Sequence, residues 1–167
     1  MTEINKLQSS DLPAVYAVFE QCFPSYAPIN ESLLQFLNET VNWDISFTAE
    51  QDGQIVGFYL LGRRKLSAAI AAENAVSHED LSRYDLICGI EGVALGVIPE
   101  FRKTGLAEQL KQQVKTIPDV DFIYGMQYKS LGNLHYWLRT RRLVAESFTA
   151  EPVYFTLEDI SQNTELG

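Results

Sequence analysis

The sequence of 167 residues predicts an α/β (α+β) protein, because segments typical of strands alternate with segments typical of helices. The clearest case is the stretch 92–112. Its first part has apolar residues at every second position, as in a half-buried strand: Val93, Leu95 and Val97. Pro99 cannot donate to a strand ladder and so ends this strand. The second part repeats apolar residues four apart on one helix face: Leu106, Leu110 and Val114. This stretch therefore predicts a strand, a sharp turn and an amphipathic helix.

The turn between that strand and that helix has the composition of an anion site. A helix N-terminus offers unpaired amide donors and the positive end of a dipole. Gly105 has no side chain, so phosphates can approach its backbone closely, and Ala107 is also small. Arg102 and Lys103 add positive charge beside the same turn. The residues therefore predict a pyrophosphate cradle; the alternative is an ordinary strand–turn–helix corner with a solvated Arg–Lys pair.

The run VIPEFRKTGLA, residues 97–107, resembles the acyl-CoA motif V-x-P-x-x-R-x-x-G-x-A of the GCN5-related N-acetyltransferases. The resemblance implies that the turn amides hold the CoA pyrophosphate and that the preceding strand pairs with the pantetheine arm. It also implies a mixed, mainly antiparallel central sheet of six to seven strands with helices on both faces. The residues to which it assigns acetyl-CoA binding are Leu95, Gly96, Val97, Arg102, Lys103, Thr104, Gly105, Leu106 and Ala107.

The length of the chain fits a single acetyltransferase-like domain, residues 1–167. An Asp52–Gly53 turn signal between two strand patterns predicts a hairpin. Asn30 is placed to cap a helix. We expect frayed residues at 161–167. The other expected elements are helices at 10–23, 31–40 and 133–138, and strands at 3–7, 46–50, 55–61, 86–97, 122–127, 143–149 and 153–157.

Residues 62–85 form an insertion relative to the family pattern. Arg63, Arg64 and Lys65 are interpreted as a solvated basic loop, and the alanine-rich stretch 68–75 as a helix. Three roles fit the insertion equally: a lid over the acceptor site, an oligomer contact such as a homodimer interface, or a mobile loop.

Composition excludes several classes of protein. The net charge of −9 argues against nucleic-acid binding and is compatible with a cationic substrate or simply with solubility. No apolar stretch is long enough to span a membrane and no signal peptide is visible, so we expect a cytoplasmic protein. With two histidines, a His-rich metal site is excluded and no metal is expected. Cys22 and Cys88 are interpreted as buried small apolar residues.

Acyl transfer to an amine requires a proton acceptor, donors for the developing oxyanion and a proton for the leaving sulfur. Glu91 lies eleven residues before Arg102, the spacing of the general base in the histone-acetylating branch of the family. If Glu91 has this role, apolar neighbours such as Val93 must raise the pKa of its carboxyl group. The alternatives are a solvent-facing Glu91 or one that only binds the substrate's cation. The amide of Val97 is the expected oxyanion donor.

The family's usual acid is a tyrosine seven residues after an asparagine, but the seventh residue after Asn133 is Thr140. Tyr136 is the nearest phenol and is our candidate acid, against the alternative of a core aromatic. Asn133 is expected to contact the pantetheine arm or to cap a helix. Three further cations are interpreted as surface residues rather than CoA ligands: Arg139, Arg141 and Arg142.

The resemblance thus implies an N-acetyltransferase that moves an acetyl group from acetyl-CoA to a primary amine by direct attack in a ternary complex. The acceptor is a small molecule or a protein amine. The rival hypothesis is a non-catalytic acyl-CoA-binding or regulatory module, which keeps the cradle but lacks a working base and acid.

Overall fold

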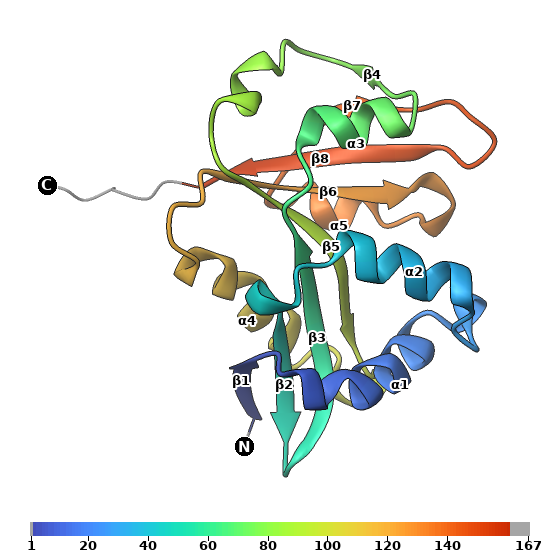
Figure 1. Ribbon diagram of the computed structural model, residues 1–167, viewed down its shortest axis with the longest axis vertical. Coiled ribbons are helices and arrows are strands. Elements are labelled where there is room, and N and C mark those ends of the chain that lie inside the picture. Colours follow the sequence, from blue (N-terminus) through green and yellow to red (C-terminus); the bar gives the residue numbers. More distant parts are fainter. Residues whose placement is uncertain (1, 161–167) are drawn as a thin grey trace, which may run out of the picture. The chain divides into compact units, whose positions relative to one another are not determined.

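The computed structural model describes residues 2–160, so the fraying expected at 161–167 lies outside the described residues. The chain divides into two compact units, residues 2–62 with 93–117 and residues 63–92 with 118–160 (Figure 1). The strand order is β1-β2-β3-β5-β6-β8-β7-β4. The boundary between the units falls inside β5 (Gly89–Val97), whose first four residues belong to the second unit.

The first unit contains three antiparallel strands and the last part of β5. These strands are β1 (Thr2–Lys6), β2 (Phe47–Gln51) and β3 (Gln54–Gly62). The turn between β2 and β3 has positive φ at Asp52 (52°) and at Gly53 (82°). This left-handed pair matches the twist of an antiparallel hairpin and is the reason for the Asp–Gly sequence. The predicted hairpin is confirmed.

Helices cover both faces of the strands in the first unit. The helices are α1 (Leu12–Cys22), α2 (Glu31–Thr40) and α4 (Leu106–Gln112). Phe58 of β3 stacks on Phe19 of α1 with ring centroids 6.0 Å apart. The preceding residue, Gly57, faces the opposite side of the strand, toward Leu110 of α4. The α2 cap is as predicted, because the Asn30 side chain accepts from the Leu33 amide at 2.8 Å.

The second unit contains the first part of β5 and four further strands. They are β6 (Phe122–Tyr128), β8 (Val153–Asp159), β7 (Arg142–Glu146) and β4 (Val76–Ser77). β5 and β6 pair in parallel, from Gly89 opposite Phe122 to Gly92 opposite Gly125. The β6–β8, β7–β8 and β4–β7 pairs are antiparallel. The sheet is therefore mixed and mainly antiparallel as expected, but it has eight strands rather than six or seven, because the insertion supplies β4.

The insertion contributes to the core of the second unit. Its helix, α3 (Leu66–Ala72), begins two residues earlier than expected and ends before Glu73. Leu66, Ala69 and Tyr84 are buried in a hydrophobic cluster with side chains of β6, β7 and β8. Arg142 of β7 donates to Glu79 at 3.0–3.1 Å and to Asp159 at 2.9 Å, which joins the insertion to the end of β8. Packing and ion pairs together make the insertion an integral part of this unit.

Short 3₁₀ turns and one short helix complete the described chain. The helix is α5 (Leu134–Trp137), which follows β6. The 3₁₀ turns are Ser9–Asp11, Pro24–Tyr26, Trp43–Ile45, Ser82–Asp85, Pro99–Phe101, Gln113–Thr116 and Lys129–Leu131.

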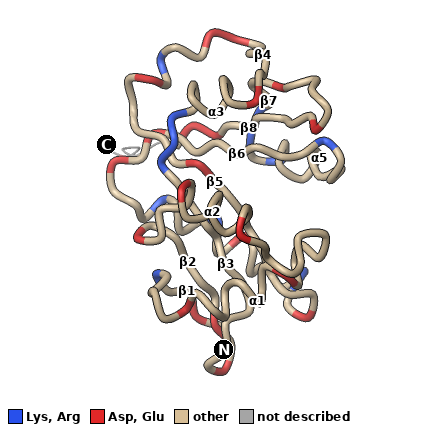
Figure 2. The backbone as a smooth tube through the Cα atoms, turned by 45° about the vertical axis from the view of Figure 1, so that its right-hand side comes forward, with Lys and Arg blue, Asp and Glu red and all other residues tan. Residues whose placement is uncertain are grey.

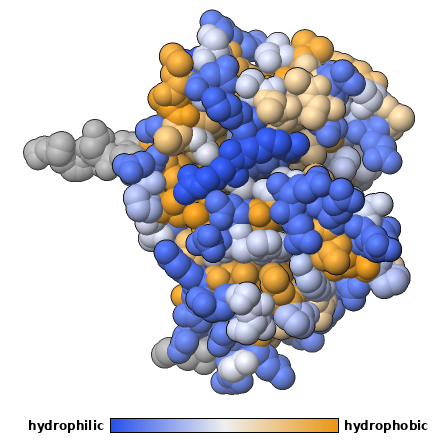
Figure 3. All heavy atoms as spheres, viewed as in Figure 1, coloured by the Kyte–Doolittle hydropathy of each residue, from blue (hydrophilic) through white to orange (hydrophobic). Residues whose placement is uncertain are grey.

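The surface is mostly polar. Acidic residues occur on both units (Figure 2), and the face in Figure 3 is mainly hydrophilic with small hydrophobic patches. No helix among residues 2–160 combines the length and apolar character that crossing a membrane requires. The described residues include no group of three or more His, Cys, Asp or Glu that could hold a metal ion. The expectation for the cysteines was wrong at Cys88, which is exposed, whereas Cys22 is half-buried.

Gly96 in β5 leaves no room for a side chain. A Cβ atom at this position would lie 2.7 Å from the Phe58 ring and 3.0 Å from the Cys22 sulfur. We predict that Gly96→Ala lowers the free energy of unfolding by about 1–3 kcal/mol, the usual cost of overpacking a core. Urea unfolding measures this loss. The same substitution in a Phe58→Leu background should cost less, and an equal cost in both backgrounds would contradict this packing explanation.

Candidate active site

The turn before α4 is built by local hydrogen bonds and two left-handed residues. After β5, the segment Pro99–Phe101 forms a 3₁₀ turn, and the Thr104 hydroxyl donates to the Phe101 carbonyl at 2.6 Å. Lys103 has a φ of 65° and Gly105 a φ of 87°. The first helical hydrogen bond then runs from the Gln109 amide to the Gly105 carbonyl at 3.0 Å. Glycine is therefore the residue that adopts the backbone conformation at the start of α4 with least strain.

The space over this turn is open. A Cβ atom added to Gly105 would meet no atom of the described residues within 4 Å, and Lys103, Thr104 and Gly105 are all exposed. The amides of a first helical turn have no acceptor within their own helix. The turn thus offers amide donors and positive helix-dipole charge to an anion from solvent.

Arg102 is exposed, but its side chain is anchored by a hydrogen bond to the preceding strand. Its Nε donates to the Val97 carbonyl of β5 at 2.7 Å. The guanidinium also lies next to Cys22: burial raises the pKa of the Cys22 thiol, and the hydrogen bond and charge of Arg102 oppose that shift. The side chain therefore ties the turn to the end of β5.

The edge of β5 that faces away from β3 carries the backbone groups of Val97. The Ile98 amide donates to Val56 of β3 at 2.9 Å, so Ile98 faces β3. Because backbone groups of neighbouring residues in a strand point to opposite edges, the amide and carbonyl of Val97 face the other edge, as do those of Leu95. Arg102 binds the Val97 carbonyl there.

Glu91 in the second unit is buried and paired with an arginine. Its side chain is 3% exposed. It lies in the β5 register position opposite Tyr124 of β6. Arg64, two residues before α3, donates from Nε to Oε1 at 3.1 Å and from Nη2 to Oε2 at 2.7 Å. The partner of Glu91 is thus a guanidinium, in place of the apolar neighbours expected from the sequence, and the solvent-facing alternative is wrong.

Tyr124 of β6 holds the backbone of Arg64 in place beside this ion pair. Its hydroxyl donates to the Arg64 backbone carbonyl at 2.7 Å. Burial and the nearby Glu91 carboxylate raise the pKa of Tyr124, which keeps the phenol protonated. Burial opposes the charge of Arg64, but the hydrogen bond and charge of Glu91 outweigh it, so the pKa of Arg64 is raised. The guanidinium is therefore a permanent cation in a fixed position.

Arg64 was not predicted as a site residue, because its basic run is typical of a solvated loop. Arg64 and Glu91 are 27 residues apart, and no spacing rule connects them. The one signal available was the run of three cations that contains Arg64.

Asn133 and Tyr136 flank the start and middle of α5. The Asn133 side chain makes no cap hydrogen bond, so the helix-cap alternative is wrong. Its Oδ1 is buried and has no hydrogen-bond partner among the described residues. A buried acceptor without a donor is costly, so Asn133 Oδ1 is available to accept a hydrogen bond from a bound molecule. Tyr136 is half-buried, with its ring edge-on to Trp137 at 5.1 Å and Arg139 at 5.1 Å from its centroid.

Arg141 is not a surface residue, contrary to expectation. It is 7% exposed, and its guanidinium lies 4.2 Å from the Trp137 ring centroid. A Cβ on Gly125 would come 2.5 Å from Arg141 Nη1, so the glycine in β6 makes room for this arginine. Arg142 and Arg139 are exposed or partly exposed.

The two units thus hold different parts of the predicted site. The first unit brings together all the residues assigned to the acetyl-CoA motif, from Leu95 to Ala107. The second unit contains Glu91, Asn133 and Tyr136, on β5, before α5 and in α5 respectively.

No family model and no curated protein matches the sequence. Solved structures do match. An agmatine N-acetyltransferase variant in its apo form has a TM-score of 0.71 and 14% identity, over 95% of this chain and 99% of that chain. The ribosomal-protein-S18-alanine N-acetyltransferase from Escherichia coli has a TM-score of 0.64 and 15% identity, over 99% and 100%. The PaiA N-acetyltransferase from Thermoplasma acidophilum, in complex with coenzyme A, has a TM-score of 0.62 and 16% identity, over 96% and 99%.

Proposed function

We propose that this chain, which has the fold of the GCN5-related N-acetyltransferases, transfers an acetyl group from acetyl-CoA to a primary amine by direct attack in a ternary complex. The observation that carries the proposal is the left-handed Gly105 at the start of α4, with open space beside the exposed residues Lys103, Thr104 and Gly105. The acceptor is a small molecule or a protein amine. No metal takes part in the proposed reaction, and its expected place is the cytoplasm.

The residues present fit coenzyme A in three respects. We assign the diphosphate to the open turn of Arg102, Lys103, Thr104, Gly105, Leu106 and Ala107, in which the Arg102 amide itself donates to the Pro99 carbonyl at 3.2 Å. The edge of β5 that carries the Val97 amide suits pairing with the amides of the pantetheine arm, along Leu95, Gly96 and Val97. In the second unit, the buried Oδ1 of Asn133 is an acceptor for a pantetheine N–H. Acetyl-CoA, when bound, supplies the acetyl group as a thioester.

Three groups of the chain move or hold charge in the proposed reaction. The Glu91 carboxylate accepts the proton of the amine, directly or through a water molecule, as the new C–N bond forms. The Val97 amide donates to the oxygen that gains negative charge. The Tyr136 hydroxyl gives a proton to the sulfur as the C–S bond breaks. Because Glu91 is 3% exposed, relay through one water is the route that its burial favours.

A second candidate function is the non-catalytic acyl-CoA-binding module. One observation favours it: both oxygens of Glu91 already accept hydrogen bonds from Arg64. In this alternative the ion pair stabilises the second unit and the turn before α4 still binds coenzyme A.

Thiol release from acetyl-CoA, measured against a broad panel of amines, separates the two functions. We expect release above the rate without amine for at least one class of acceptor, together with a rise in melting temperature on adding acetyl-CoA, since a ligand selective for the native state raises apparent stability. Stabilisation without release across the panel would support the binding module. The absence of both would contradict both candidates.

A further inference from the structure

Arg64 is the solvent-facing member of the ion pair with Glu91. The Arg64 side chain is 26% exposed, whereas that of Glu91 is 3% exposed. A molecule that approaches this pair from solvent therefore meets the guanidinium before the carboxylate. The exposed group has positive charge, which repels an ammonium ion and attracts an anion.

The guanidinium has hydrogen-bonding capacity beyond Glu91. Arginine has five N–H donors in a fixed planar fork, and Glu91 takes one from Nε and one from Nη2. Glu91 leaves three donors unused, and the Tyr124 hydroxyl shares one hydrogen bond with the same side chain, so two donors remain for a ligand. The remaining side of the fork matches the geometry of a second carboxylate.

The fork is held in place before a ligand arrives. Glu91 fixes its orientation through two hydrogen bonds, and Tyr124 holds the Arg64 backbone through the carbonyl. A group that is already ordered loses little freedom on binding, which favours affinity.

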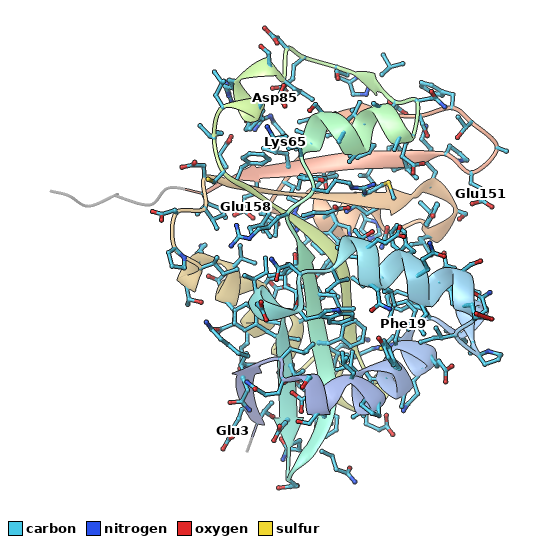
Figure 4. All side chains as sticks on the ribbon, viewed as in Figure 1. Glu3, Phe19, Lys65, Asp85, Glu151 and Glu158 are labelled. Atoms are coloured by element: carbon cyan, nitrogen blue, oxygen red, sulfur yellow. The ribbon has the colours of Figure 1, made fainter. Side chains whose placement is uncertain are left out.

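The residues on either side of Arg64 are also positively charged. Arg63 and Lys65 are both exposed, and with Arg64 they form the only run of three consecutive cations in a chain of net charge −9. Figure 2 shows the run as a blue stretch leading into α3, and Figure 4 labels Lys65 at that point. Positive potential is therefore concentrated beside the one residue assigned to take a proton from the acceptor.

We infer that Arg64 binds a carboxylate of the amine acceptor, so that the acceptor class is an amine that also carries a carboxylate, with the α-amino acid as its smallest form. This inference rests on the proposed function, because Glu91 is the group assigned to the amine. Arg64 is then a specificity-determining residue: one face of its fork holds Glu91 and the other holds the substrate.

Calorimetric titration of the full chain with coenzyme A present tests the inference without requiring turnover. The probes are three amino acids and the amines that remain when their carboxylate is removed: L-leucine and 3-methylbutylamine, L-phenylalanine and phenethylamine, L-lysine and cadaverine. We expect at least one amino acid to bind about tenfold or more tightly than its matched amine, as a charge-assisted hydrogen bond predicts. Arg64→Met should remove this preference. Lys115→Met, which deletes an exposed cation in the first unit, should keep it.

Two further variants keep the test valid if Arg64→Met alone fails to fold. Arg64→Met with Glu91→Gln removes both charges and leaves no unpaired ion, and it should also lose the preference. Arg64→Lys keeps the positive charge but lacks the planar fork, and it should retain only part of the preference for the amino acid over the matched amine. Equal binding within every pair, no binding of any amino acid, or an unchanged preference in Arg64→Met would each overturn the inference. Thiol release that favours amines without a carboxylate would overturn it while leaving the proposed acetyl transfer intact.

Discussion

Gly105→Asp is expected to weaken the binding of coenzyme A by about a hundredfold or more relative to Gly105→Asn. Asp and Asn have the same shape, and both tolerate the left-handed conformation that Gly105 adopts with a φ of 87°. Neither side chain meets protein atoms close to its Cβ, because nothing lies within 4 Å of that position. The variants therefore differ in one negative charge. A like charge beside a diphosphate costs several kcal/mol, which corresponds to at least a hundredfold in affinity.

Calorimetric titration of both variants with coenzyme A measures this difference. Urea unfolding is the control: both variants should lose about 1–2 kcal/mol against the parent chain, the cost of a side chain in this conformation, and the two losses should be similar. Equal affinities for coenzyme A in the Asp and Asn variants would show that the diphosphate lies elsewhere, and the proposed cradle would have to be abandoned.

Glu91→Gln is expected to lower kcat for acetyl transfer by about a hundredfold to ten-thousandfold, the range that a positioned general base contributes. Glutamine keeps the size of the side chain and can still accept one hydrogen bond from Arg64, but it cannot take the proton of the amine. The affinity for coenzyme A should not change, because every residue assigned to the diphosphate belongs to the other unit. Steady-state thiol release and calorimetry measure the two quantities separately.

The stability of Glu91→Gln has to be measured with its activity. Breaking a fully buried ion pair costs about 3–5 kcal/mol, and we expect less here, about 1–3 kcal/mol, because Arg64 is 26% exposed and water screens it. Glu151→Gln, at an exposed position labelled in Figure 4, is the matched control and should leave both activity and stability unchanged. Full turnover in a folded Glu91→Gln variant would assign the proton to another group. It would also remove the reason for placing the acceptor beside Arg64.

Local sequence rules were sufficient for elements whose conformation depends on near neighbours. The Asp52–Gly53 hairpin follows from the left-handed φ values that such a turn requires. The start of α2 follows from the Asn30 side chain, which bonds an amide three residues on. The same holds for the break of the strand at Pro99 and the start of a helix after Gly105, whereas the left-handed φ of Gly105 was not predicted.

By itself, then, the sequence determined the strand–turn–helix corner, the alternation of elements and the mixed sheet that its family resemblance implied. Only the tertiary structure decided what meets Glu91, what fills the space at Gly96 and Gly125, and that the insertion adds α3 and β4 to the second unit. The physical reason is the separation along the sequence of the residues that interact. Turns and caps are set by backbone dihedrals and hydrogen bonds within a few residues. The Arg64–Glu91 pair and the burial of Arg141 depend instead on which distant segments share a face of the sheet, and no periodicity in the sequence records that choice.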